Sequence, residues 1–120
     1  METQEAVERF IERIRHLTDE DISALWESRY VVREVARSLA WEAARHAAWS
    51  AAKFETWDRA QDEVYDVMAA LIRRSEQMGA IVRGAILPAI LALVVKDAIT
   101  PEQFDALHGP WAHAMEGARQ

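Results

Sequence analysis

The sequence predicts an all-α fold: a single-domain bundle over residues 1–120, with about five helices packed around an apolar, proline-kinked helix at 80–97. Three observations support this. Apolar residues recur at intervals of three and four along most of the chain, which is the period of an amphipathic helix. Only three prolines and four glycines interrupt the sequence. No stretch rich in proline, glycine and serine divides it, so we expect one domain.

Composition and charge exclude several classes of function. Acidic residues outnumber basic ones by 20 to 14, and the formal net charge is −6. This balance disfavours binding to nucleic acid or to anionic membranes. The absence of cysteine excludes disulfides, zinc–thiolate sites, iron–sulfur clusters and thiol nucleophiles. The segment METQEAVERFIER is charged and amphipathic, unlike a secretory signal, so we expect a cytoplasmic protein.

The first helix is expected over residues 4–16. Its apolar residues form one stripe, which comprises Val7, Phe10, Ile11, Ile14 and Leu17. The following segment, Thr18 to Asp21, resembles a capping box, in which a threonine and an acidic residue three positions later satisfy the first backbone amides of a helix. A second helix therefore begins near residue 19.

The end of the second helix is harder to locate, because neither glycine nor proline occurs between Thr18 and Gly79. We assign the second helix to 19–54, with a secondary kink near Ser28 or Ser38. The third helix is assigned to 57–77, capped by Thr56 or Asp58. Gly79 then serves as a C-cap or a hinge.

Residues 80–95 are apolar on nearly all sides, which predicts a helix buried by several neighbours. Only 12 residues separate Arg83 from Lys96, whereas a membrane-spanning helix needs about 20, so we expect no membrane span. Pro88 should kink or restart this helix. A short last helix begins at the strong start signal around Pro101 and ends at Gly109-Pro110. We expect the side chain of Trp111, in a turn after this helix, to pack against the core.

The segment LAWEAARHAAWSAAKFETW has tryptophans at every eighth position: Trp41, Trp49 and Trp57. Eight residues advance a helix by about 80° beyond two turns, so these side chains wind around the helix. One interpretation is a central helix in which large and small side chains interlock. The other is a tryptophan face that stays open for a partner subunit or an apolar ligand.

This alternation of Ala-Ala with Trp, together with the tail KDAITPEQFDALHGPW, resembles Ala- and Trp-rich helical proteins of unknown function from GC-rich actinobacteria. The resemblance implies a bacterial source, but it implies no activity.

Two residues of the second helix could carry chemistry. Position 46 lies seven residues after Leu39 and about 20° from it around the helix, so His46 should point toward the core. Glu42, one turn earlier, could orient His46 as a general base. The alternative is a core histidine with a local carboxylate partner. No second set of carboxylate and histidine ligands accompanies the pair, so we predict neither a metal site nor a cofactor.

Arg83 is the only charge inside the apolar run. It could form a salt bridge with an acid of a neighbouring helix, or hold a ligand carboxylate or phosphate in an apolar pocket. Such a pocket would lie between the second and fourth helices, lined by Trp41, Trp49 and Ile86.

The leading hypothesis is a non-enzymatic interaction module that forms a homo-oligomer, as a dimer, through its Trp/Ala-rich helix surface. The alternative is a protein that binds a small apolar or anionic molecule in the pocket just described, or a simple acid–base enzyme that uses Glu42 and His46. Neither hypothesis involves nucleic acid, a membrane or a cofactor.

Overall fold

The computed structural model describes residues 3–28, 34–50 and 53–118, and every regular element in these ranges is helical. The elements are α1 (Thr3–Arg15), α2 (Asp19–Glu27), α3 (Glu34–Ser50), α4 (Phe54–Arg74), α5 (Glu76–Ile81), η2 (Val82–Ile86), α6 (Leu87–Val94), η3 (Lys96–Ala98) and α7 (Pro101–Ala118). The all-α class is confirmed. Because α5, η2 and α6 form one continuous run, these ranges contain six helical rods rather than about five.

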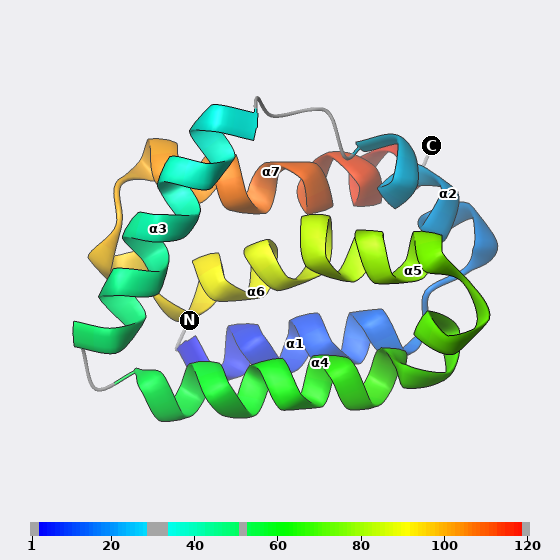
Figure 1. Cartoon of the computed structure of the whole chain (residues 1–120), viewed down its shortest axis with the longest axis horizontal. Helices are drawn as coiled ribbons and strands as arrows, with labels where there is room; N and C mark the ends of the chain where they lie inside the picture. Colours follow the sequence, from blue (N-terminus) through cyan, green and yellow to red (C-terminus); the bar gives the residue numbers. More distant parts are fainter. Residues whose placement is uncertain (1–2, 29–33, 51–52, 119–120) are drawn as a thin grey trace.

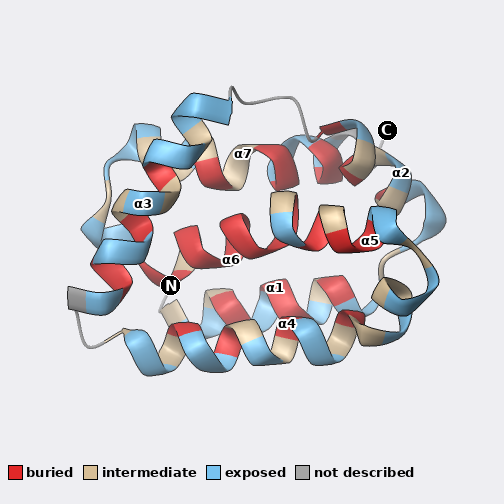
Figure 2. Ribbon diagram, viewed as in Figure 1, coloured by how far each residue is buried: buried red, intermediate tan, exposed pale blue. Residues whose placement is uncertain are grey.

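The continuous run from Glu76 to Val94 forms the centre of the molecule. It lies between α7 on one side and α1 with α4 on the other, while α3 and α2 pack at its two ends (Figure 1). Most of it is buried (Figure 2), including Leu87 through Ala92. By length and composition this run could cross a membrane, but 72% of it is buried inside the protein, as expected for the central helix of a bundle. The predicted apolar core helix is therefore confirmed.

Pro88 interrupts this run without a sharp break. The five residues before Leu87 form the π-helical turn η2, in which the Leu87 amide donates to the carbonyl of Val82. In a regular α-helix the carbonyl of Gly84 would accept from the amide of residue 88, which proline lacks. Here Nη1 of Arg37, from α3, donates to the Gly84 oxygen at 3.3 Å. The predicted irregularity is present, and a side chain of another helix replaces the lost backbone donor.

The start of the chain follows its sequence signals. The buried stripe of α1 is the expected one, Val7, Phe10, Ile11 and Ile14. The capping box at the start of α2 is also present, because Thr18 and Asp21 exchange two backbone–side-chain hydrogen bonds of 2.9 and 3.1 Å. Asp21 is buried, and Arg13 binds its two carboxylate oxygens at 3.0 and 3.1 Å. This contact ties α1 to α2.

The expected 19–54 helix is two helices. α2 ends at Glu27 with Ser28 as its C-cap, so the helix ends where only a kink was expected, and residues 29–33 lie outside the described ranges. The expected start of the next helix at 57 is wrong, because α4 begins at Phe54. The turn lies at Lys53, whose ammonium donates to the Val94 carbonyl at 3.3 Å and pairs with the Asp97 carboxylate. A contact with a distant helix end thus fixes this boundary.

The expected 57–77 helix ends three residues early. Ser75 adopts an extended conformation and accepts a hydrogen bond from the amide of Gln77, so it caps α5 instead of continuing α4. Gly79 is neither a C-cap nor a hinge. It is buried inside α5, and the Arg83 guanidinium lies against it: a Cβ at Gly79 would be 3.2 Å from Nη1 of Arg83.

The prediction that Gly109-Pro110 ends the last helix is also wrong. α7 continues through Pro110 to Ala118. Proline already holds the helical φ angle, and Pro110 is fully buried, as are Trp111 and Ala114 beside it. Burial of this face outweighs the lost hydrogen bond. The expected contact of Trp111 with the core is confirmed, since its ring lies 4.4 Å from that of Phe10 between centroids.

Candidate functional site

Helix α3 has two faces of opposite character. Four of its alanines face inward, where α3 packs against α7 and α6: Ala40, Ala44, Ala47 and Ala48 are all buried. Small side chains allow such helices to approach closely. This part of the Ala/Trp segment therefore follows the interlocking interpretation.

The opposite face of α3 carries large apolar side chains in solvent. Val35 is 72% exposed, and Leu39 and Trp49 are each 67% exposed. With about 100° per residue, positions 35, 39, 42, 46 and 49 fall within a sector of about 80°. We call these five residues, together with Phe54 at the start of α4, the α3 outer face. Figure 2 shows much of α3 as exposed surface.

The prediction that His46 points toward the core is wrong. His46 is exposed, as is Glu42. The spacing argument placed position 46 on the same side as Leu39, and the structure agrees, but Leu39 itself faces solvent. Glu42 forms a loose pair with Arg45 of its own helix, with Oε2 and Nη2 separated by 3.6 Å. An exposed pair has no desolvated setting for acid–base work.

The three residues expected to line a pocket with Arg83 lie in different environments. Trp41 is half-buried, and its ring meets that of Trp57 edge-on at 6.2 Å. Trp49 projects into solvent and stacks on Phe54, with ring centroids 4.6 Å apart and an interplanar angle of 24°. Ile86 is fully buried. The structure therefore does not bring Trp49 and Ile86 to a common surface.

Arg83 is exposed rather than buried, and no acid of the described residues lies within ion-pairing distance of it. It lines an open hollow of about 700 Å³ where the end of α2 approaches the junction of α4 and α5. The other lining residues include Trp26, Ile72 and Ala80. Sequence reasoning missed Trp26 here, because only the tertiary fold brings α2 next to α5.

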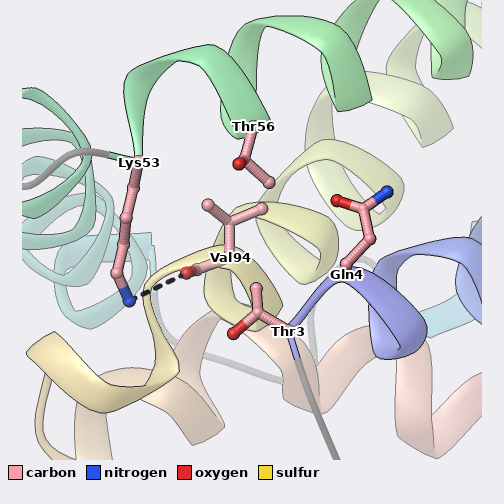
Figure 3. Close-up of a pocket in the computed structure, with 5 residues that line it drawn as sticks. All are labelled: Thr3, Gln4, Lys53, Thr56 and Val94. Carbon is pink, nitrogen blue, oxygen red and sulfur yellow. Dashed lines mark hydrogen bonds between the residues drawn. The ribbon is translucent and has the colours of Figure 1, made fainter.

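A second hollow, of about 290 Å³, lies at the other end of the central run (Figure 3). Thr3, Gln4, Thr56, Lys53 and Val94 line it. The Lys53 ammonium, the one charged group among the described lining residues, is already engaged by the Val94 carbonyl and by Asp97. The Lys53 hydrogen bond lowers the pKa of the Asp97 carboxyl. This lysine holds the C-terminal end of α6, so the hollow offers no spare charge to a ligand.

Across residues 3–28, 34–50 and 53–118, no three side chains of His, Asp or Glu gather in a way that could hold a metal ion. The most perturbed imidazole is that of His108, which is half-buried against the Phe104 ring at 4.9 Å. Burial, and then the nearby charge of Lys96, lowers its pKa. This histidine packs on its own helix and faces neither hollow.

No family model, curated protein or solved structure matches the chain. Its function is therefore argued from its own residues, and the α3 outer face is the surface whose composition most needs an explanation.

Proposed function

We propose that the protein is a non-enzymatic helical interaction module that self-associates through the α3 outer face. One observation carries this proposal. Of the five large hydrophobic side chains that are exposed among the described residues, four belong to this face: three lie on α3, and Phe54 of α4 stacks on one of them. Exposed apolar residues scattered singly need no explanation, but several large ones aligned on one helix face are typical of an interaction surface.

The energy at stake is large enough to drive association. A tryptophan side chain buries about 150–250 Å² when covered. Trp49 is 67% exposed, which leaves about 100–170 Å² of it in water. At about 25 cal/mol per Å², covering it would contribute about 3 kcal/mol. In a symmetric dimer each residue acts twice, and Val35 and Leu39 add to the sum.

The test is sedimentation of the wild type and of Leu39→Glu by analytical ultracentrifugation. We expect a dimer for the wild type and a rise of about 100-fold or more in the dissociation constant for the variant. Tyr65→Glu is the matched control, because Tyr65 is 40% exposed but lies on α4, away from the α3 outer face. At protein concentrations low enough for the wild type to be monomeric, both variants should keep its melting temperature, since both side chains are exposed.

A wild type that stays monomeric at about 100 μM would contradict self-association, as would a Leu39→Glu variant that dimerises as tightly as Tyr65→Glu.

A second candidate function rests on Arg83. An exposed guanidinium with no acidic partner among the described residues, next to Trp26 in a hollow of about 700 Å³, would suit an amphiphilic molecule with one carboxylate or phosphate group. Titration with 8-anilinonaphthalene-1-sulfonate, an aromatic anion, tests this. Binding should weaken in Arg83→Leu and persist in the control Arg45→Leu. Equal binding by both variants would refute this function.

A further inference from the structure

The α3 outer face is complementary to itself in one arrangement. We infer that its partner is a second copy of the chain, docked antiparallel about a two-fold axis at the level of Ala44, so that Glu42 meets the partner's His46 and Leu39 meets the partner's Trp49. This inference rests on the proposed function and adds the identity of the partner, its direction and its register.

The register follows from the spacing of the exposed residues. Glu42 and His46 lie two residues before and after position 44, and Leu39 and Trp49 lie five residues before and after it. At about 1.5 Å per residue, the two pairs stand about 3 Å and 7.5 Å on either side of that level. In an antiparallel pair with its axis there, each residue faces its counterpart. Two Glu42–His46 pairs in the centre are then flanked by a Leu39–Trp49 pair on each side.

The ends of the face fit the same register. Val35 lies nine residues before position 44 on α3, and Phe54, which begins α4, stacks on Trp49 at the opposite end of the face. Val35 of one copy would therefore approach the stacked aromatic pair of the other. Every exposed large hydrophobic residue of the face gains an apolar neighbour.

Charge disfavours the other simple arrangements. A parallel pair would place Glu42 beside the partner's Glu42. An antiparallel axis at position 42 would also bring two glutamates together, whereas an axis at position 46 would pair the two histidines and leave each Glu42 without a histidine opposite it. Like charges that face each other weaken an interface, whereas opposite charges fix its register. The loose 3.6 Å pair with Arg45 engages only Oε2 of Glu42 and leaves this carboxylate able to meet a partner.

Mixing two variants tests the arrangement. In the Glu42→Lys homodimer, each introduced lysine lies opposite the partner's His46. In the His46→Glu homodimer, each introduced glutamate lies opposite the partner's Glu42. Each homodimer should therefore have a dissociation constant about 3- to 10-fold higher than that of the wild type. In the mixed dimer, by contrast, the introduced lysine faces the introduced glutamate, and the remaining histidine faces the remaining glutamate. Native mass spectrometry of an equimolar mixture should therefore show heterodimer well above the roughly half that random mixing gives.

The control mixture combines Glu20→Lys with His113→Glu, which carry the same charge changes at exposed positions on α2 and α7 and should mix randomly. If the Glu42 and His46 variants mix randomly while Leu39→Glu still dissociates the wild-type dimer, the antiparallel register is wrong. Self-association through the α3 outer face would still stand. A monomeric wild type would overturn both. Because the compensating charges lie on different copies, contacts within one helix cannot produce the heterodimer preference.

Discussion

The hydrogen bond between Arg37 and the Gly84 carbonyl should be energetically coupled to Pro88. Proline at position 88 leaves that carbonyl without its backbone donor, and Nη1 of Arg37 supplies one at 3.3 Å. A hydrogen bond from a charged donor contributes about 1.5–3 kcal/mol net. This bond is slightly long and Arg37 is half-buried, so about 1 kcal/mol is the appropriate magnitude.

A double-mutant cycle measures this term. Arg37→Met removes the donor, and Pro88→Ala restores an amide four residues after Gly84. Arg37 has a further interaction that Arg37→Met also removes, but the cycle cancels it because it is lost in both backgrounds. Urea unfolding followed by tryptophan fluorescence should give a coupling free energy of about 1 kcal/mol, with unchanged slopes. Additive effects, within about 0.3 kcal/mol, would refute the view that Arg37 replaces the missing backbone donor.

Three further predictions concern the titratable and charged side chains Asp21, His108 and Lys53. Hydrogen bonding to Arg13 is the main cause of the lowered pKa of Asp21, so Asp21→Asn should lower the free energy of unfolding by about 2 kcal/mol at pH 7. This difference between the variant and the wild type should shrink as the pH falls below 3.8. An unchanged difference at low pH would argue against the Arg13–Asp21 pair. Burial lowers the pKa of His108 below 6.5, so the unfolded chain binds a proton more readily than the folded one. The melting temperature should therefore fall as the pH is lowered from 7.5 to 5.5. In His108→Gln the melting temperature should fall less over the same pH range. Lys53→Met should cost about 1 kcal/mol in urea unfolding, because it removes the donor to the end of α6, and a neutral result would mean that this cap does not stabilise the fold.

Proline alone does not decide where these helices end. Pro88 and Pro110 both lie within helical runs, although both sequence contexts suggested an interruption. Before Pro88 the run forms a π-helical turn, and Arg37 of α3 donates a hydrogen bond to the Gly84 carbonyl. At Pro110, by contrast, α7 remains α-helical and its face stays buried. Which of these happens depends on what packs around the proline, and this information is absent from the local sequence.

The site predictions depended on the same kind of missing information. The spacing of Leu39, Glu42 and His46 correctly placed them on one side of a helix, because the helical period is a local property. Which side faced the core could not be derived from hydrophobicity. The more apolar residues, Leu39 and Trp49, face out, and the alanines face in, because close packing against α7 favours small side chains.

Sequence patterns alone predict the all-α class, the stripe of α1, the capping box at Thr18, the helix start at Pro101, and the apolar central helix. These features arise from interactions between residues a few positions apart, which a sequence pattern records directly. The tertiary structure alone decided the turn at Lys53, the continuity of α7 through Pro110, and the outward orientation of Val35, Leu39 and Trp49. Each depends on contacts between helices far apart in the chain, where burial and packing outweigh local preference.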